Sequence, residues 1–328
     1  MRVGKSDTAN ATLRERRNQP QSKYFLSGHG KILNQTQATG FVTLRLNLRV
    51  VILFYFQSEI INMLTSVQNP LIKQLRKLQR TKGRREQQLF LLEGTHLIEE
   101  ALATQYPLLT VCYTAQWQNR YPRLWESVCQ AASRSEEVNE RVLQAIATTV
   151  NPDGIIATAP RPQPQTVAIT QIGLALETVQ DPGNLGTMIR TAAAAGIDGL
   201  WLSDDSVDLD HPKVLRASAG AWFRLPMAVG GDLTEQLTIA QQQGVQIVAT
   251  LPDADLTYWE LDFQQPTIVV LGNEGAGLSS SLTALADQHV QIPLSGGVES
   301  LNVAICAALM LYEGQRQHQN RTLNLPSP

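Results

Sequence analysis

The sequence has few cysteines and none of the common metal-site or phosphate-loop patterns. Its 328 residues include only three cysteines, Cys112, Cys129 and Cys306, which are far apart and odd in number. This spacing fits neither a disulfide framework nor a metal cluster, so we expect buried, reduced thiols. There is no HExxH pattern and no P-loop with its Lys-Ser/Thr pair. These absences argue against a metalloenzyme, a disulfide-rich secreted protein and a P-loop nucleotide hydrolase.

A long uncharged apolar run is also missing. Residues 41–61 are apolar and β-branched, but Arg45 and Arg49 leave only 50–57 uncharged. A membrane-spanning helix needs about 20 apolar residues, so this segment is far too short. Residues 41–61 weakly resemble an organelle transit peptide, but serine is sparse, and we favour a non-native or disordered extension, residues 1–62, ahead of Met63. We therefore expect a cytoplasmic protein.

Positive charge is scarce in the C-terminal half. Residues 167–328 hold six Lys/Arg against seventeen Asp/Glu, whereas residues 63–93 hold seven Lys/Arg against two acids. Those seven are Lys73, Arg76, Lys77, Arg80, Lys82, Arg84 and Arg85. Such a basic segment predicts a polyanionic partner, and nucleic acid is the first candidate. The alternative is an amphipathic helix whose basic face is merely solvated.

Alternating strand and helix patterns predict two α/β domains. We assign a small α/β domain to 63–159, a Pro-rich linker to 160–166, a larger domain to 167–316 and a tail to 317–328. In the larger domain the predicted strands are 174–179, 199–202, 245–250, 267–271 and 289–292, and the predicted helices are 188–195, 212–221, 232–243 and 300–315. This alternation implies a parallel sheet with helices on both faces. Ligands of such sheets bind outside the carboxyl ends of the strands.

Three glycine-containing segments lie at those strand ends. In residues 181–190 a tight turn leads into a helix, with Asn184 near its start and Arg190 two turns in. Arg190 stands among small and apolar residues, so it needs an anion or a carboxylate such as Glu177 or Glu274. Residues 271–278 place three glycines around Glu274. Such a loop is also compatible with a plain turn.

The third segment, residues 292–304, runs from a strand end through a glycine loop into an apolar helix. Gly296 and Gly297 allow a sharp turn and a close approach to a ligand. Ser300 and Asn302 lie where the helix should begin. Both side chains are good helix caps, so capping and ligand contact remain open as alternatives.

Taken together, the three segments resemble the three motifs of the SpoU/TrmH family of RNA ribose 2′-O-methyltransferases, in the SPOUT class. The matches are N-x-G-x-x-x-R at 184–190, L-G-N-E-G-x-G-L at 271–278 and I-P-L-x-G-x-x-E-S-L-N-V-A at 292–304. Residues 212–226 are similar to the family segment between the first two motifs. Residues 63–158 resemble its N-terminal substrate-binding domain, of the two-domain type that favours ribosomal RNA. Residues 1–62 match nothing in the family.

The resemblance implies a deep trefoil knot, a homodimer packed through the knot region, and methyl transfer from S-adenosyl-L-methionine to a ribose 2′-OH, without a metal. The implied catalytic residues are Arg190, Asn184, Glu274, Ser300 and Asn302. The implied cofactor-binding residues are Thr250, Leu251, Gly272, Asn273, Gly275, Ile292, Leu294, Leu301 and Asn302.

Arginine is a poor general base because its guanidinium stays protonated in water. We therefore favour Arg190 as a group that orients the nucleophile and stabilises charge, with a base role as the alternative. The acidic run 204–210 is expected to face away from RNA. Three other functions remain as alternatives: a tRNA 2′-O-methyltransferase, a non-catalytic RNA-binding or ribosome-assembly protein with the same fold, and a nucleotide-dependent α/β enzyme.

Overall fold

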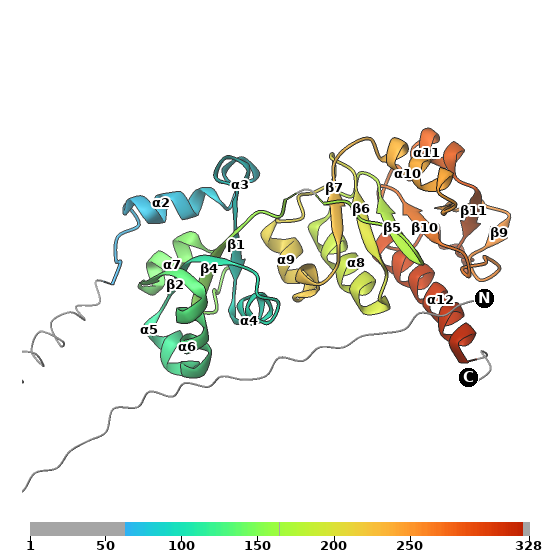
Figure 1. The fold of residues 1–328 in the computed structure, drawn as a ribbon. Helices are drawn as coiled ribbons and strands as arrows, with labels where there is room; N and C mark the ends of the chain where they lie inside the picture. Colours follow the sequence, from blue (N-terminus) through green and yellow to red (C-terminus); the bar gives the residue numbers. More distant parts are fainter. Residues whose placement is uncertain (1–62, 164, 324–328) are drawn as a thin grey trace, which may run out of the picture. The chain divides into compact units, whose positions relative to one another are not determined.

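The computed structural model describes residues 63–163 and 165–323, which fold around two β-sheets (Figure 1). Both sheets belong to the same compact unit. The predictions made for residues 1–62 and 324–328 lie outside this range. Within the described part of the chain, no helix is both long and apolar enough to cross a lipid bilayer.

The N-terminal sheet has four strands in the order β1-β4-β2-β3. Their bounds are β1 Leu89–Glu93, β2 Leu108–Tyr113, β3 Ala132–Glu137 and β4 Ile155–Pro160. The helices around it are α2 Pro70–Lys77, α3 Thr81–Gln87, α4 Thr95–Ala103, α5 Ala115–Arg120, α6 Pro122–Ala131 and α7 Glu140–Ile146. The sequence did not predict α5, α6 or β3. The last of these is an edge strand with the polar sequence ASRSEE, so it carries no alternating apolar pattern.

The C-terminal sheet has seven parallel strands in the order β7-β6-β5-β10-β8-β11-β9. Their bounds are β5 Ile172–Leu176, β6 Gly199–Leu202, β7 Met227–Val229, β8 Gln246–Thr250, β9 Leu256–Thr257, β10 Thr267–Leu271 and β11 Gln288–Gln291. The connecting helices are α8 Pro182–Ala195, α9 Pro212–Ser218, η1 Ala221–Phe223, α10 Leu233–Gln242, α11 Ser280–Leu285 and α12 Val303–Leu323. The predicted parallel α/β sheet is confirmed.

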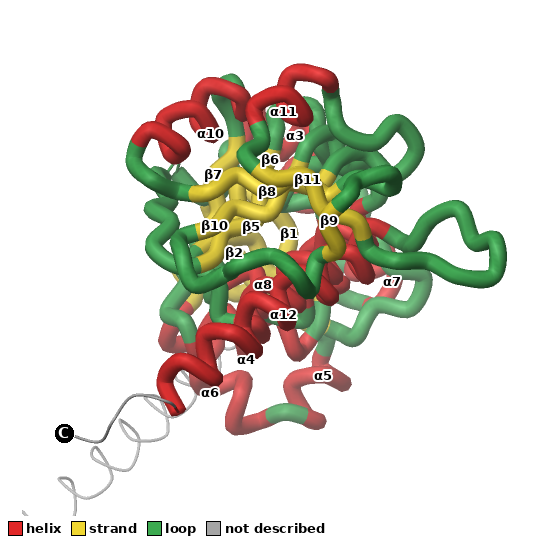
Figure 2. The backbone as a smooth tube through the Cα atoms, turned by 90° about the vertical axis from the view of Figure 1, so that its right-hand side faces the viewer, coloured by secondary structure: helices red, strands yellow, loops and turns green. Residues whose placement is uncertain are grey.

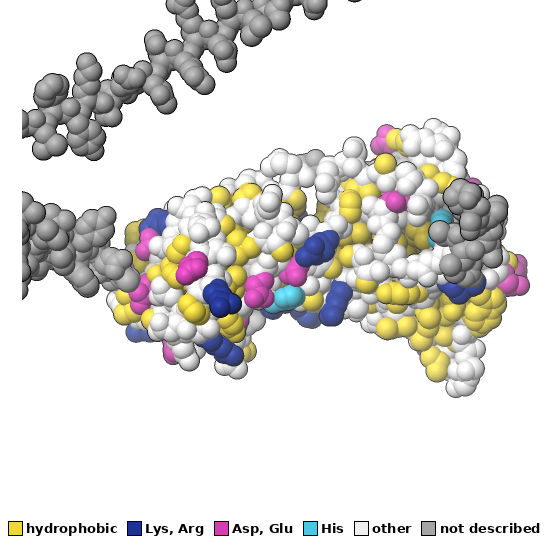
Figure 3. Space-filling view, turned by 60° about the horizontal axis from the view of Figure 1, so that its bottom comes forward, with side chains coloured by type: hydrophobic (Ala, Val, Ile, Leu, Met, Phe, Trp, Pro, Cys, Tyr) yellow, Lys and Arg dark blue, Asp and Glu magenta, His cyan; other side chains and the backbone are white. Residues whose placement is uncertain are grey.

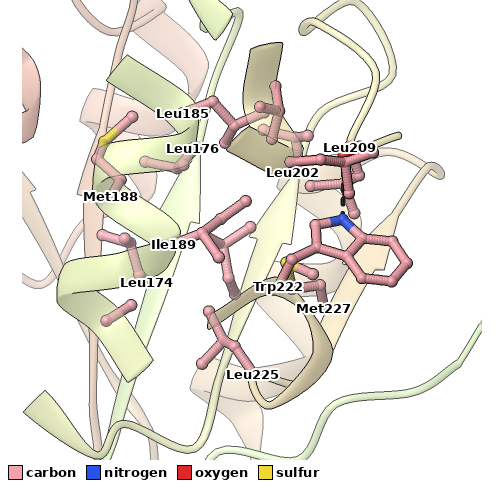
Figure 4. Close-up of a cluster of buried hydrophobic side chains, with 14 of the residues drawn as sticks. Leu174, Leu176, Leu185, Met188, Ile189, Leu202, Leu209, Trp222, Leu225 and Met227 are labelled. Atoms are coloured by element: carbon pink, nitrogen blue, oxygen red, sulfur yellow. Dashed lines mark hydrogen bonds between the residues drawn. The ribbon is translucent and has the colours of Figure 1, made fainter. Parts of the chain in front are cut away.

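Helices cover both faces of this sheet. Figure 2 shows α10 and α11 on one side of the strands and α8 and α12 on the other. Neighbouring residues of β5 therefore lie in different cores. Leu174 belongs to a first cluster, which includes residues of α8, whereas Ala175 belongs to a second cluster together with Leu237 of α10. Figure 4 shows Met188 and Ile189 of α8 among the apolar side chains of the first cluster. This packing holds α8 firmly against the sheet.

Two helices differ by several residues at their starts or ends from the predicted bounds, whereas α9 and α10 differ by three residues or fewer. α8 begins at Pro182 and not at Met188, because Asp181 accepts a hydrogen bond from the Asn184 backbone N–H at 2.8 Å and so caps the helix. α12 begins at Val303 and continues to Leu323, beyond the predicted end at 315. Its last turns are anchored by Gln317, which donates to the Leu261 carbonyl at 2.9 Å.

Candidate functional site

A cleft of about 500 Å³ lies at the carboxyl ends of three adjacent strands, β10, β8 and β11. Thr250 and Leu251 line it at the end of β8, Gly272 at the end of β10, and Ile292 just after β11. This is the place predicted for a ligand of a parallel sheet. All nine residues expected to bind a cofactor line this one cleft.

The loop after β10 forms a closed turn at the cleft wall. Asn273 and Gly277 exchange two backbone hydrogen bonds of 3.0 Å, and Asn273 Oδ1 accepts from the N–H groups of Gly275 and Ala276. A Cβ on Gly272 would lie 2.3 Å from the Gly277 carbonyl carbon and oxygen, so only glycine fits there. The backbone, and not a side chain, therefore forms this part of the wall.

Three side chains from the three motifs form one hydrogen-bonded chain at the cleft. Asn184 Nδ2 donates to Glu274 Oε1 at 3.0 Å, and Asn302 Nδ2 donates to Asn184 Oδ1 at 2.9 Å. Asn302 Oδ1 also accepts from the Ala304 N–H at 2.9 Å, so Asn302 caps α12 as well. The alternatives of capping and site formation were thus not exclusive for this residue.

Glu274 is ionised within this set of three hydrogen-bonded side chains. Burial opposes its ionisation, but hydrogen bonds from Asn184 and from backbone N–H groups, including that of Gln180, outweigh burial and lower the pKa of Glu274 below its ordinary value. An ionised Glu274 accepts hydrogen bonds only, which fixes Asn184 with its amide nitrogen toward it. The oxygen of Asn184 is then left for Asn302.

Two hydroxyl groups at the cleft are free to bind a ligand. Thr250 Oγ1 is buried and has no hydrogen-bond partner within the described chain. Ser300 also lines the cleft, but its side chain is exposed and makes no bond within residues 63–163 and 165–323. A buried hydroxyl without a partner is costly, so the Thr250 position points to a ligand with a matching polar group.

Arg190 lies apart from the cleft lining, on the exposed face of α8. Among the described residues its guanidinium has neither a hydrogen bond nor an ion pair. The alternative of a structural pair with Glu177 or Glu274 is therefore wrong: Glu177 accepts instead from Ser279 N at 2.7 Å, and Glu274 bonds Asn184.

The seven predicted RNA-binding residues divide into two groups. The first group is exposed on α2, on α3 or between them, and consists of Lys73, Arg76, Lys77, Arg80 and Lys82. The exposure of the basic residues on α2 follows from its two faces. Ile72 and Leu75 are buried on one face, and the basic residues point outward from the other.

The second group is tied to the acidic run. Arg84 is 1% exposed and bonds Asp208 at 2.7 Å and Asp210 at 3.0 Å. Arg85 is exposed but pairs with Asp208 at 2.9 Å. Arg84 is therefore unavailable to an RNA phosphate, contrary to the expectation from its sequence context. The acidic run turns two of its carboxylates inward onto these arginines.

The cysteines only partly match the expected buried thiols. Cys112 is buried, and burial raises the pKa of its thiol to about 12. Cys129 is exposed, and Cys306 is half-buried at the cleft. Within the described ranges, no group of His, Cys, Asp and Glu could hold a metal ion.

Sequence reasoning missed two residues that line the cleft outside the three motifs, Pro252 and Cys306. Cys306 lies one helical turn after Asn302 on α12, so the four-residue helical spacing was the available signal. Pro252 follows Leu251, an expected cofactor-binding residue, and has no chemical signature of its own.

Known proteins share both parts of this architecture. The SpoU rRNA Methylase family matches residues 171–312, and the MRM3-like substrate binding domain matches residues 69–157. An uncharacterized tRNA/rRNA methyltransferase of Synechocystis sp. is 49% identical over 77% of this chain and 93% of its own length. The 23S rRNA (guanosine(2553)-2′-O)-methyltransferase RlmP of Bacillus subtilis is 34% identical over 75% of this chain and 96% of its own length.

Solved structures agree. The AdoMet-bound rRNA methyltransferase of Sinorhizobium meliloti has a TM-score of 0.70 and 32% identity, covering 78% of this chain and 97% of that one. The SpoU methyltransferase AviRb of Streptomyces viridochromogenes, in complex with AdoMet, has a TM-score of 0.69 and 28% identity, covering 77% and 99%. The trefoil knot predicted from the resemblance is part of this fold. The chain belongs to the SpoU rRNA methylase family.

Proposed function

We propose that this protein transfers a methyl group from S-adenosyl-L-methionine to a ribose 2′-OH of ribosomal RNA, in the cytoplasm. The observation that carries the proposal is the hydrogen-bonded chain Glu274–Asn184–Asn302 beside a ligand-sized cleft. Relatives named as 23S rRNA 2′-O-methyltransferases support ribosomal RNA over transfer RNA.

The cleft fits the cofactor. Its volume of about 500 Å³ lies within the range of small-molecule sites. Apolar walls from Leu251, Ile292 and Leu301 suit an aromatic base, and the buried Thr250 hydroxyl offers an unused polar group. The bound cofactor would supply an electrophilic methyl group on a sulfonium.

The chain's own residues position the nucleophile. A 2′-OH is a weak nucleophile, so it must be held in line with the methyl group and release its proton to solvent water as it attacks. Glu274 and Asn302 both form hydrogen bonds with Asn184, and Asn302 also caps α12, so both act as positioning residues. The Ser300 hydroxyl and the second N–H of Asn184 remain free to contact the ribose.

Arg190 is proposed to bind the RNA phosphate next to the reacting ribose and to stabilise charge as the proton leaves. Its exposed guanidinium, free of any carboxylate in the described chain, supports this role. Guanidinium groups pair well with phosphate because their donors form a planar fork.

The RNA is proposed to lie along the N-terminal domain. Residues 63–159 would bind RNA and residues 167–316 would transfer the methyl group. The exposed basic residues on α2 and α3 give the first part its attraction for phosphates.

We also propose a homodimer through the knot region. Exposed apolar side chains line the loop before α12 and the outer face of α12: Leu294, Val298, Leu301, Ile305 and Tyr312. Ile305 and Tyr312 also border a groove of about 420 Å³. Figure 3 shows one face of the molecule with hydrophobic side chains gathered at its lower right. Such patches favour a protein partner, and a second copy would bury this one.

The dimer is tested by sedimentation of Ile305→Asp and of a control, Ile239→Asp, which is equally exposed but lies on α10. The first substitution should give monomers and the second should not. Dimers in both variants would exclude this surface.

Transfer of tritium from labelled S-adenosyl-L-methionine to ribosomal RNA tests the activity. Wild type should label the RNA at a ribose 2′-O, and Arg190→Ala should lose the label. Arg134→Ala should keep it, because Arg134 is exposed and its ion pair is with Glu136. Label on transfer RNA alone would favour the tRNA enzyme. No label, combined with no cofactor binding by calorimetry, would favour a non-catalytic RNA-binding protein.

A further inference from the structure

We propose that a second, polar pocket in the N-terminal domain holds a single unpaired RNA base and so selects the substrate. The pocket has a volume of about 280 Å³ and lies between α5, the start of α7 and the loop before β4. It is separate from the catalytic cleft, with no lining residue in common. The inference rests on the proposed function, because it assumes an RNA substrate.

The side chains at the pocket suit a base. Gln116, Gln144 and Asn151 bring amide groups from three segments, and Arg120 adds a guanidinium. In the part of the chain that the structure describes, none of these four side chains makes a hydrogen bond or an ion pair. Amides present donors and acceptors together, which is the pattern on the edge of a nucleobase.

The size also favours one base. Sites for drug-sized ligands begin near 300 Å³, so this pocket suits a single small planar group. Unpaired bases splayed out of loops are what proteins read in RNA, through hydrogen bonds to base edges and stacking on arginine planes. Arg120 is exposed, and its guanidinium carbon lies over the Tyr121 ring, 5.3 Å from the ring centre.

The floor of the pocket is rigid. The Trp117 indole N–H donates to Thr95 Oγ1 at 2.8 Å, and the Thr95 backbone N–H donates to Asp153 Oδ2 at 2.9 Å. Gly154 has φ +100°, and a Cβ there would lie 2.7 Å from the Trp117 Cβ. A glycine is therefore required where the loop closes on the tryptophan. A preformed floor lowers the ordering cost of binding.

The pocket and the catalytic cleft are tied to the same helix, α9. Thr148, just before the pocket loop, accepts a hydrogen bond from Arg216 at 2.8 Å, and Arg216 also pairs with Glu93 at 3.2 Å. One turn earlier on α9, Lys213 pairs with Asp181 at 3.3 Å, next to Asn184. Because of these contacts to α9, a base held in the pocket would have a fixed position relative to the site of methyl transfer.

Saturation-transfer NMR of the full chain with the four ribonucleoside 5′-monophosphates tests the pocket, with ribose 5-phosphate as the control ligand. At least one nucleotide should show strong transfer to its base protons, and ribose 5-phosphate should show none. The double variant Gln116→Ala/Gln144→Ala should lose the signal, and Asn119→Ala, exposed on α5 but outside the pocket, should keep it. Equal signals from ribose 5-phosphate, or an unchanged signal in the double variant, would overturn the inference.

Steady-state methylation separates this inference from the proposed function. The double variant should raise KM for ribosomal RNA about tenfold, with kcat and cofactor affinity unchanged. Normal methylation with an unchanged KM would refute the pocket and leave the function standing. Base binding that is lost in the double variant, in a protein that methylates no RNA, would support the pocket and refute the function.

Discussion

Arg84 Nε lies 3.0 Å from Asp210 Oδ1, and both side chains are 1% exposed. This buried ion pair joins α3 of the N-terminal domain to the loop before α9. Asp208 bonds both Arg84 and Arg85, and Arg161 bonds Asp210 from the start of the linker. A buried network in which every charge has a partner fixes geometry more than it adds stability. Here the network holds α3 against the methyltransferase domain.

Replacing Arg84 with Met should destabilise the fold. The substitution leaves Asp210 in the interior with fewer partners, and removal of one member of a buried pair costs about 3–5 kcal/mol. Urea unfolding measures the change. Arg80→Met is the matched control, because Arg80 is exposed and its loss should stay within about 0.5 kcal/mol. Equal effects from the two variants would contradict a structural role for Arg84.

Acid should weaken the same network. Burial alone would raise the pKa of Asp208, but its bonds to Thr81 and Arg85 and the charge of Arg84 outweigh burial and lower that pKa. A carboxyl with a lowered folded pKa stabilises the fold above its unfolded value of about 3.9 and loses this contribution as pH falls through the folded pKa. Melting temperatures from pH 6 to pH 2.5 should therefore fall more steeply for wild type than for Asp208→Asn. Parallel curves would show that Asp208 contributes nothing to the fall of the melting temperature in acid.

Thr250→Val should weaken cofactor binding without harming the free protein. The buried hydroxyl has no partner in the described chain, so its removal should leave the unfolding free energy unchanged or higher. Loss of one hydrogen bond to the cofactor should raise its Kd about tenfold. Calorimetry measures the Kd of the cofactor, and urea unfolding measures the free energy of unfolding. Thr104→Val should behave oppositely, because Thr104 Oγ1 donates to the Glu100 carbonyl at 2.8 Å and Thr104 does not line the cleft. An unchanged Kd for Thr250→Val would remove Thr250 from the site.

Glu274→Gln should lower kcat with little change in cofactor affinity. The new amide cannot accept as well from Asn184 Nδ2, so the chain through Asn184 to Asn302 loses its fixed orientation. A small misplacement of a reacting group costs about 10²-fold in rate. Single-turnover methylation measures this step. Glu299→Gln at the same cleft serves as the control, since no bond of its side chain occurs within the described residues. A wild-type rate for Glu274→Gln would contradict the positioning role.

Neutralising the basic face of α2 should weaken RNA binding and reduce its dependence on salt. Lys73→Gln/Lys77→Gln removes two exposed charges, and each lost phosphate contact flattens the slope of log K against log salt by about 0.7–0.9. Binding to ribosomal RNA at several salt concentrations gives the slope. Arg134→Gln removes an exposed charge on β3 and should leave the slope unchanged. The same slope in all three proteins would show that α2 is only a solvated helix.

The sequence alone determined the class of fold, and its three motifs contain most of the residues that line the cleft. Alternating apolar strands and helices imply a parallel sheet because both faces of each strand must be covered. The three motifs each follow a strand, so their residues gather at one edge, and the cleft contains Asn184, Glu274, Ser300 and Asn302. Local spacing carried that information because each motif is a single turn or loop.

Only the tertiary structure decided which polar groups are paired. Arg84 and Arg85 are neighbours with the same chemistry, yet one is buried on Asp210 and the other is exposed, because the partners come from more than 120 residues away. In the same way, Arg190 turned out to be unpaired and Thr250 to be buried without a partner. Burial and hydrogen bonding depend on which distant segments pack together, and no local pattern records that packing.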